Sequence, residues 1–586
     1  MIKSRLNHLG LLLLKKGRIR MAYSIKQELC SACHQCRVEC PVGAIRIKNA
    51  KYWIDPDKCV SCGSCVKVCH NGCIESDEPK AAPVLHEPIE ITCDVCVVGG
   101  GGSGMVAAAL AVDAGLDTVL VEKNWETGGC ATYASGFRTH YSQWHKELGL
   151  PDEREKTYAE FMEKTEGKVP GDFVKAMFRA NEKFFDWLID KHDYGEAYSY
   201  EKGFMGMMTK PKWQWERAGT RIDRMIGPGE GGWYITTKLL KDFLAGGGRV
   251  YYKTAGRHLI TDDTGAVTGI ECEDEGGKVI VHAKSVVLAT GAITRNKELM
   301  DKFQPLFYDD EGKEPIHIFT ISTDTGDGVT MGLELGADVD YENRRINMFG
   351  PMRHPYPAVS LTLALCGSGV NFGSQGNMLD GSALDGHEVS DLVFDPKRYC
   401  WRVIDEKIAV AAIEKGMQEP PQSPGMDLPG FLKNWRDVLK EEEEDGAVVM
   451  ADTLEELARK LGFDPARFQA DMAAANEATR NAPPPPPTPF GPGTPAQPVE
   501  EGPFYALKLK LFHEDAIGGL VTDANAQVQK DGKPVKGLFA CGGTTRGVII
   551  AGDVGVNYLE MVFSALTQAF NEGWMAGEAA VNNAKA

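Results

Sequence analysis

The chain has 586 residues, of which 43% are hydrophobic, 9% aromatic and 25% charged, and its formal net charge is −18 at pH 7. This length exceeds what one hydrophobic core supports and predicts about three or four domains. The acidic balance argues against nucleic acid and anionic membrane surfaces as partners, and no apolar run approaches the ~20 residues of a membrane span.

The first 22 residues contain a short apolar run, residues 9–14, which Gly10 interrupts and basic residues soon end. This run is too short for the core of a signal peptide, and no small-residue cleavage site follows it. We therefore expect an N-terminal arm or docking helix at 1–22, and a cytoplasmic protein.

Two runs of cysteines with the spacing C-x2-C-x2-C-x3-C come next, namely Cys30, Cys33, Cys36, Cys40 and Cys59, Cys62, Cys65, Cys69. In this pattern three thiolates of one run bind one [4Fe–4S] cluster, while the fourth cysteine of each run binds the other cluster. The spacing therefore predicts cluster one on Cys30, Cys33, Cys36 and Cys69, and cluster two on Cys59, Cys62, Cys65 and Cys40. Zinc is the alternative for paired C-x2-C motifs, but eight cysteines in two runs exceed its needs. Disulfides are disfavoured because no secretory segment is evident.

Residues 23–78 resemble a bacterial two-cluster ferredoxin, including the C-P-V-G-A-I piece at 40–45. The resemblance implies one-electron exchange with a ferredoxin-like or other one-electron partner, and an anaerobic setting that suits oxygen-sensitive clusters. Cys73 has no ligand slot in this scheme, and packing is its simplest interpretation.

A Pro-, Ala- and acid-rich linker at 79–91 leads to an apolar strand at 93–98, a glycine-rich turn at 99–104, a helix at 105–114 and a second strand at 119–122. Gly99, Gly101 and Gly104 fit the G-x-G-x-x-G fingerprint, in which glycines let the backbone approach a pyrophosphate at a helix N-terminus. Glu122 ends the second strand, where an acid binds ribose hydroxyls.

Further segments resemble the flavoprotein family of fumarate reductase, succinate dehydrogenase and 3-ketosteroid dehydrogenase. They are Gly128–Gly136, Val286–Ala292, Thr325–Gly328, His354–Pro355, Gly502–Ala506, Gly518–Asp523 and Gly537–Gly543, in unbroken order. The resemblance implies FAD as cofactor and a fold of mixed α/β and α+β class with several domains. A two-cluster ferredoxin domain (23–78) would precede a Rossmann-like FAD-binding domain in two parts (92–343 and 502–586), split by an α+β capping domain (344–501).

The resemblance also implies the FAD-binding residues Gly99, Gly101, Gly102, Ser103, Gly104, Glu122, Lys123, Gly128, Gly129, Ala131, Thr132, Ser135, Gly136, Ala289, Thr290, Gly291, Asp327, Gly542, Gly543 and Asn557. Membrane-type fumarate reductases attach FAD to a histidine beside the Gly-Gly segment. No histidine lies between Gly128 and Gly136, where Cys130 is the nearest unusual residue, so we expect noncovalent FAD. Gly543 stands where many relatives have an acid.

The substrate pocket departs from that of soluble fumarate reductases. His354 and Thr362 keep a histidine and a hydroxyl, but the proton relay becomes Leu363 and Cys366, and the proton-donating arginine falls near Leu384. A second substrate histidine falls on Glu514, and the last clamping arginine on Asp553. Two carboxylates ~4 Å apart repel by about 4 kcal/mol at an effective dielectric of 20, so a dianion should bind poorly. The alternative is that Glu514 and Asp553 point away and pair with a base such as Arg546.

These residues predict a ferredoxin-coupled, FAD-dependent ene-reductase or dehydrogenase acting on an activated C=C bond of a neutral or cationic, enone-like substrate. The G-G-L-x-x-D segment at 518–523 resembles 3-ketosteroid dehydrogenases and keeps steroid-like substrates possible. Candidate acids are Asp553 and Glu514, with Tyr558, His354 and Tyr356 behind them, because burial raises a carboxyl pKa toward the working pH.

Three alternatives remain. A non-catalytic electron-transfer subunit would not need a capping domain. An NAD(P)H-dependent reductase would need a second complete nucleotide fingerprint, and fumarate reduction is disfavoured by the pocket. Elsewhere, helical periodicity at 454–479 and the acid run 441–445 favour structural roles, with docking of a basic partner as an option for the acids, and Pro483–Pro498 predicts a loop.

Overall fold

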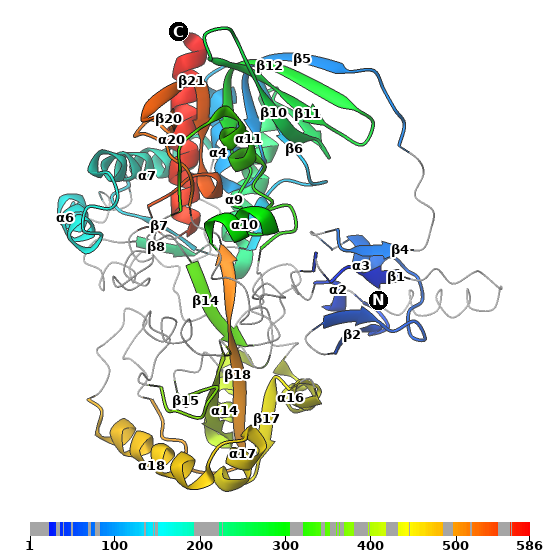
Figure 1. Cartoon of the computed structure of the whole chain (residues 1–586), viewed down its shortest axis with the longest axis vertical. Coiled ribbons are helices and arrows are strands. Elements are labelled where there is room, and N and C mark those ends of the chain that lie inside the picture. Colours follow the sequence, from blue (N-terminus) through cyan, green and yellow to red (C-terminus); the bar gives the residue numbers. More distant parts are fainter. Residues whose placement is uncertain are drawn as a thin grey trace.

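The computed structural model describes residues 23–27, 29–30, 35–38, 40–48, 51–67, 69, 72–76, 83–133, 136–143, 146, 151–192, 222–225, 227–304, 320–341, 346–351, 359, 363, 368–379, 397, 399–417, 432–444, 446–483, 496–515, 518–548, 563 and 565–586. They form an eight-stranded sheet, a five-stranded sheet and several two-stranded ladders. Figure 1 shows the larger sheet at the top, the smaller sheet at the bottom and a cysteine-rich segment, residues 23–76, at the right.

The larger sheet is built around parallel strands. Its strands are β5 (Ile89–Val98), β6 (Thr118–Glu122), β9 (Arg249–Tyr252), β10 (Ala255–Thr261), β11 (Val267–Glu273), β12 (Lys278–Leu288), β20 (Gln527–Lys530) and β21 (Lys533–Ala540). β5 pairs in parallel with β6 and β12, and β21 joins the end of β12 in parallel. Val95 and Val97 enter one buried cluster while Cys96 and Val98 enter another, so the strand is apolar on both faces.

Helices α4 (Gly102–Asp113) and α20 (Ala565–Lys585) cover one face of this sheet, and α9 (Gly227–Ala245) and α7 (Gly171–His192) pack outside them, against α4 and α20 respectively. Helix α11 (Asp327–Leu335) lies on the other face, where Met331 is buried among strand residues. The C-terminal helix is tied to the sheet by the Ser285 hydroxyl, which donates to the Ala580 carbonyl at 2.9 Å. The last helix thus completes the domain that β5 begins.

The smaller sheet has the strand order β14 (Ile346–Pro351), β18 (Phe504–Asp515), β16 (Tyr399–Asp405), β15 (Val370–Gly373), with β17 (Val448–Ala451) also on β18. Helices α14 (Glu406–Met417), α16 (Trp435–Glu444), α17 (Leu454–Leu461) and α18 (Pro465–Asn481) accompany it, and they share one buried core with the strands. β18 begins just beyond Gly502 and still pairs with β14 and β16, so the smaller sheet extends past the proposed boundary at residue 501.

The cysteine-rich segment repeats one local structure. Strand β1 (Tyr23–Ile25) pairs with β4 (Ile74–Ser76), and β2 (Ile45–Lys48) pairs with β3 (Lys51–Ile54), while α2 (Gln35–Val38) and α3 (Ser64–Lys67) carry cysteines. Gly43 and Gly72 have φ angles of 58° and 56°, and each N–H donates to the carbonyl of the cysteine three residues earlier, at 3.2 and 3.0 Å. Each half therefore turns in the same way after its fourth cysteine.

One carboxylate joins the cysteine-rich segment to the smaller sheet's helices. Glu441 in α16 lies 3.4 Å from Arg37 Nη2 and 3.7 Å from Arg46 Nη1. This residue belongs to the acid run for which docking of a basic partner was an option, and the basic groups that it meets belong to the same chain.

The remaining elements are α6 (Arg154–Lys164), α10 (Lys297–Phe303), the 3-10 turns η1 (Gly129–Tyr133) and η4 (Gly542–Thr544), and the ladders β7 (Gly136–Thr139) with β8 (Ile222–Met225) and β13 (Val339–Asp340) with β19 (Gly519–Leu520). Of the predicted elements, the strands around Cys93–Val98 and Val119–Glu122 and the helix between them are confirmed, as is the mixed α/β class. The periodic stretch 454–479 is two helices, because Gly462 adopts a φ of 78° and Pro465 starts α18. In the parts of the chain that the structure describes, helices fall short of the length and apolarity that crossing a bilayer requires.

His192, at the end of α7, is a buried histidine whose imidazole lies between two carboxylates. Its Nδ1 lies 2.6 Å from Asp242 and its Nε2 lies 3.3 Å from Asp113, while Lys238 and Lys191 also reach these carboxylates. Burial opposes the imidazolium charge, but the hydrogen bonds and charges of Asp113 and Asp242 outweigh it and raise the pKa of His192. The stabilisation is therefore complete below about pH 6.5, the unfolded pKa, and is lost as pH rises through the raised folded pKa.

We expect His192→Gln to lower the free energy of unfolding by about 1–3 kcal/mol at pH 5.5, because the partly exposed carboxylates of Asp113 and Asp242 lose the charged, buried partner between them. The deficit should shrink at pH 9, where the parent histidine is neutral. Thermal unfolding at both pH values measures it, and His282→Gln, at an exposed histidine, is the control. A deficit that is equal at both pH values would contradict a charge effect.

Candidate cofactor site

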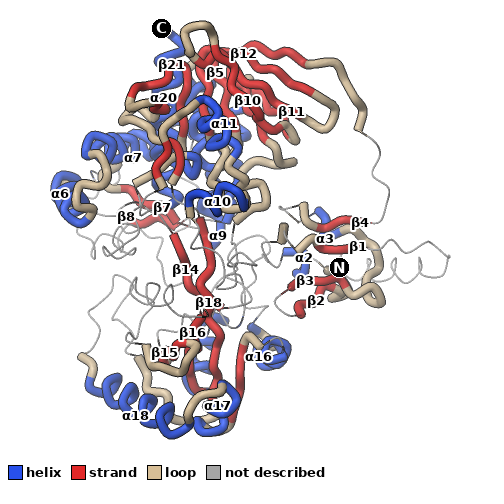
Figure 2. Tube along the Cα trace, in the orientation of Figure 1, coloured by secondary structure: helices blue, strands red, loops and turns tan. Residues whose placement is uncertain are grey.

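The predicted cofactor residues lie along one edge of the larger sheet. The parallel strands β5, β6, β12 and β21 end there, at Val98, Glu122, Leu288 and Ala540 (Figures 1 and 2). In α/β sheets, ligands bind beyond the carboxyl ends of the strands, in the loops that follow them. The first loop is the glycine-rich turn, and the other three supply the rest of the site.

The glycine-rich turn is tight enough to require its glycines. Gly99 has a φ of 103°, and a Cβ there would lie 2.3 Å from the Ala289 carbonyl oxygen. A Cβ on Gly104 would lie 2.0 Å from the Gly99 carbonyl oxygen. Neither contact is possible for a larger residue without moving backbone.

The start of α4 suits an anion. Gly101 is its N-cap and makes no side-chain capping bond, so the first N–H groups of the helix remain available. A Cβ on Gly101 would meet nothing closer than the Gly129 Cα, at 4.0 Å. This space beside uncapped N–H groups fits a pyrophosphate.

Glu122 lies at the end of β6, against the same turn. It is 8% exposed, and its carboxylate accepts hydrogen bonds from the backbone N–H groups of Gly100 and Asn124, both at 2.7 Å. Burial raises the pKa of this carboxyl, although the two N–H groups act against the rise. Glu122 thus holds the glycine turn in shape at the position where a ribose contact is predicted.

The predicted flavin segment lies directly on this turn. The Gly128 N–H donates to the Gly100 carbonyl at 2.8 Å, and Gly101 and Gly128 form an isolated bridge. A Cβ on Gly129 would lie 3.0 Å from the Gly101 Cα. Glycines stand on both sides because the two backbones touch, and η1 then carries Ala131 and Thr132 along the site.

Two further turns close the edge. After β12, the Thr290 hydroxyl accepts from the Gly328 N–H at 2.8 Å. After β21, a Cβ on Gly543 would lie 3.1 Å from the Ala292 nitrogen, so the two turns are in contact. Glu572 of α20, 1% exposed, accepts from the Gly542 N–H at 2.9 Å and anchors the second turn.

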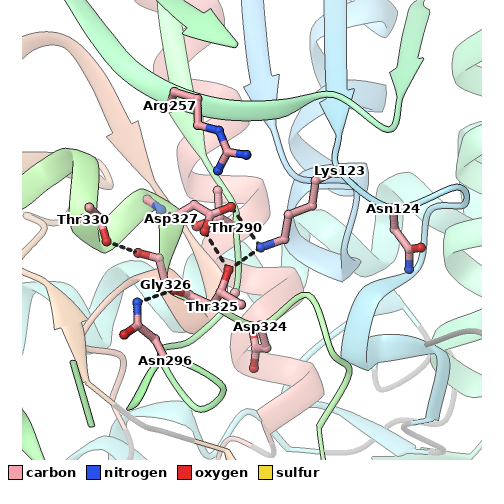
Figure 3. A network of polar contacts seen from close by, with 12 residues as sticks. Lys123, Asn124, Arg257, Thr290, Asn296, Asp324, Thr325, Gly326, Asp327 and Thr330 are labelled. Carbon is pink, nitrogen blue, oxygen red and sulfur yellow. Dashed lines mark hydrogen bonds and ion pairs between the residues drawn. The ribbon is translucent and has the colours of Figure 1, made fainter. Parts of the chain in front are cut away.

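Lys123 and Asp327, both predicted cofactor residues, form an ion pair across the site (Figure 3). The Lys123 Nζ lies 2.9 Å from Asp327 Oδ2, and the Thr325 hydroxyl donates to Asp327 Oδ1 at 2.7 Å. Asp327 starts α11, where a carboxylate stabilises the helix dipole. The loops after β6 and before α11 are thereby locked together.

A buried acid lies beneath the flavin segment. Asp324 is 3% exposed and accepts from the Ala292 N–H at 2.7 Å and from the Thr320 hydroxyl at 2.8 Å. Burial raises the pKa of Asp324 to about 6. The sulfur of Cys130 lies 2.9 Å from the Thr320 hydroxyl oxygen. A buried carboxyl with a raised pKa therefore lies next to η1.

Arg295 relates this region to the cysteine-rich segment. Its guanidinium donates to the Thr320 carbonyl at 2.8 Å. Burial lowers the pKa of Arg295, while the charges of Asp324, Cys130, Cys30 and Cys73 act in the opposite direction. Cys30 and Cys73 are thus close enough to influence a residue of the flavin site.

Four cysteines from the two runs line one cavity. An apolar cavity with an empty volume of about 310 Å³, partly open to solvent, is lined by Cys40, Cys59, Cys62 and Cys65, the set predicted for cluster two. Thiolates around one zinc ion would instead close to about 2.3 Å from the metal. The four sulfur donors suit a cluster. Cys30, Cys36 and the buried Cys69, from the set for cluster one, lie in one small core, which also contains Cys40, Cys59 and Cys65 of the other set.

Several predicted residues lie outside the described residues: Cys33, Ser135, His354, Tyr356, Asp553, Asn557 and Tyr558. Leu363 is described and buried, whereas Thr362, Cys366 and Leu384 are not described. Glu514 lies in β18 and Gly136 in β7, for which the backbone is described. The catalytic roles of these residues remain predictions.

Sequence reasoning missed Asp324, Thr320, Arg295 and Glu572. Asp324 directly precedes the T-G-D-G motif, and Arg295 follows the turn after β12, so their positions in the sequence carried a weak signal. Glu572 lies 30 residues beyond Gly542, within a helix, and only the fold brings the two together.

A family model described as "FAD binding domain" matches residues 94–555, and one described as "4Fe-4S dicluster domain" matches residues 29–74. The first match covers most of the chain and the loops of the candidate site from Gly99 to Gly543.

Curated relatives include NADH:acrylate oxidoreductase of Vibrio harveyi, 25% identical over 84% of the chain and 50% of the relative, and NADH:fumarate oxidoreductase of Klebsiella pneumoniae, 25% identical over 84% and 48%. The chain therefore spans about half the length of each. Among solved structures, a 3-ketosteroid-Δ4-(5α)-dehydrogenase from Rhodococcus jostii RHA1 matches with a TM-score of 0.60 and 22% identity, over 86% of the chain and 100% of that structure. This likeness shows a shared fold.

Proposed function

The chain belongs to the FAD binding domain family, and from this membership we propose that it is an iron–sulfur flavoprotein oxidoreductase that reduces, or in reverse forms, an activated C=C bond. The substrate proposed is enone-like and is not a dicarboxylate. A ferredoxin-like protein or another one-electron carrier is the proposed partner.

The observation that carries this proposal is the position of the cysteine-rich segment. The space beside the uncapped start of α4 and the ion pair of Lys123 with Asp327 support a dinucleotide at the sheet edge. Arg295, which lines that edge, is influenced by the charge of Cys30. We propose that the cysteines of cluster one lie on the side of the flavin site, while those proposed for cluster two line a cavity partly open to solvent.

When bound, the clusters would exchange single electrons and FAD would exchange a hydride with the substrate carbon. The chain's own residues bind and orient the cofactor for this exchange. Glycines 99, 101 and 104 let the backbone approach the cofactor, and Glu122 fixes their turn. We propose noncovalent binding, because Cys130 hydrogen-bonds with Thr320 and no histidine lies in the segment.

Proton transfer is assigned to acids from the smaller domain and the segment after β21. Asp553 and Glu514 would hold the proton that the substrate's α-carbon receives, with Tyr558, His354 and Tyr356 as further candidates. A carboxyl in this role works best with a pKa near the working pH. The same carboxylates replace the cationic groups that would bind a dianion, which disfavours the substrate named for the relative from Klebsiella pneumoniae.

We expect the isolated chain to oxidise dithionite-reduced dye when an enone is added under anaerobic conditions. Fumarate should give negligible turnover because two acids repel its second carboxylate. Reoxidation of the flavin, followed by its absorbance, measures both. Brisk fumarate turnover would contradict the assignment of the pocket, and turnover only after addition of a second protein would favour a non-catalytic electron-transfer subunit.

A further inference from the structure

Cys73 has no ligand slot, yet it is buried among cluster ligands. It is 4% exposed, and its sulfur lies 3.2 Å from the sulfur of Cys69. Its backbone N–H lies 3.3 Å from the same sulfur, and its thiol also hydrogen-bonds with Cys30. Cys30 and Cys69 both belong to the set for cluster one, so Cys73 contacts two ligands of one cluster.

The internal repeat shows what this residue adds. Residues 40–45 read C-P-V-G-A-I and residues 69–74 read C-H-N-G-C-I, so Cys73 corresponds to Ala44. The glycines before them share a left-handed turn, with φ angles of 58° and 56°. The Ala44 N–H lies 3.2 Å from the Cys40 sulfur, as the Cys73 N–H lies 3.3 Å from that of Cys69. With matching backbones, the second half carries a thiol where the first carries a methyl group.

We propose that the Cys73 thiol donates hydrogen bonds to the ligand sulfurs of cluster one and sets that cluster's reduction potential above that of cluster two. The inference rests on the proposed function in taking the two cysteine runs as cluster ligands. A ligating thiolate carries no proton, so the S–H of Cys73 is the donor. Hydrogen bonds to cluster sulfurs stabilise the more negative, reduced state and so raise the potential.

The position of Cys73 gives this effect a direction. Cys30, a ligand in the set for cluster one, contributes to the electrostatic surroundings of Arg295 at the flavin site, and we therefore take cluster one as the cluster beside the flavin. A higher potential at this cluster favours movement of electrons from the cavity of Cys40 and Cys59 toward the sheet edge. The role of Cys73 is therefore to hold an S–H donor beside the cluster, and it is not a catalytic residue.

The test is an EPR-monitored redox titration of the full chain with its clusters and FAD. Cys73→Ala recreates the arrangement at Ala44 and removes the donor. At a fixed potential the ratio of oxidised to reduced cluster one should rise about tenfold, which is a fall of ~59 mV for a one-electron couple. The potential of cluster two and the iron content should not change.

Two further variants separate the hydrogen bond from packing. Cys73→Ser keeps an O–H donor and should stay closer to the parent potential than Cys73→Ala. Ala44→Cys adds a thiol beside Cys40, a ligand in the set for cluster two, and should raise the potential of that cluster. The shift also shows which EPR signal belongs to which cluster. Equal shifts for Cys73→Ser and Cys73→Ala would show that sulfur packing, and not the donor, matters.

Two results would overturn the inference. Unchanged potentials in Cys73→Ala would show that the thiol donates no hydrogen bond of consequence, and loss of one cluster's iron would make Cys73 a ligand. Neither measurement uses a substrate. If the parent chain turns over enones and Cys73→Ala has the parent's potentials, this inference alone is refuted. If the parent chain lacks two EPR-active clusters, the proposed function is refuted.

Discussion

Gly101→Ala is expected to give a folded chain that no longer retains FAD. The backbone of Gly101, with φ −70° and ψ −174°, accepts alanine, and the new methyl group meets nothing within the protein closer than 4.0 Å. It would, however, fill the space beside the first N–H groups of α4. Loss of two charged hydrogen bonds, at about 1.5–3 kcal/mol each, weakens binding by roughly 10²-fold or more.

Flavin absorbance per chain, with circular dichroism for folding and iron analysis for the clusters, measures this result. Iron should stay near about eight atoms per chain, four for each cluster. Gly265→Ala, in the exposed turn between β10 and β11, is the control: its φ of 82° makes the backbone cost larger than at Gly101, and it lies far from the cofactor loops, so it should keep its FAD. A full complement of FAD in Gly101→Ala would show that the pyrophosphate does not approach this helix.

The second large effect is expected from Asp553→Ala, which should lower turnover at least ~10-fold. A general acid that protonates the substrate in the transition state contributes about 10²–10⁴ to the rate. Removing the Asp553 carboxyl should therefore slow turnover even if another group takes over part of its role. The measurement is enone turnover with reduced dye, normalised to bound flavin. Asp263→Ala removes an exposed aspartate in a turn and should leave the rate unchanged.

Unchanged turnover in Asp553→Ala with intact flavin would move the acid to Glu514 or Tyr558. The matching variant Glu514→Gln then distinguishes the carboxyl from the phenol, because it removes the Glu514 carboxyl and leaves Tyr558 in place. A loss of bound FAD in either variant would instead point to a structural role.

Local signals in the sequence predict the parts of the site that depend on neighbours along the chain. The strand Cys93–Val98, the turn of Gly99 and Gly104 and the start of α4 follow one another within 20 residues, and each has its own physical requirement. The cysteine spacing likewise predicts that Cys40 lies with Cys59, and both line one cavity.

Other features depend on pairs far apart in the sequence. Glu441 meets Arg37 across 404 residues, and Glu572 meets Gly542 only because α20 packs on the larger sheet. The order of the smaller sheet follows no local pattern, since β18 pairs with strands on both sides that come much earlier in the chain. Aspartate and arginine usually lie at the surface, so the sequence offers no reason to single out Asp324 and Arg295. Their burial and their hydrogen bonds, to the Ala292 N–H and the Thr320 carbonyl respectively, are visible only in the fold.

The pairing of β14 with β18 has a mechanical consequence. Ile346, where the chain enters the smaller sheet, lies opposite Asp515, where it leaves, so both attachments of that sheet meet at one rung of one ladder. The two backbone crossings at this rung define a hinge axis, and any turn about it would also have to break the contacts of Glu441 with Arg37 and Arg46. Any turning of the smaller sheet about this axis would carry Glu514, at the hinge itself, through a short arc and the distant α18 through a long one.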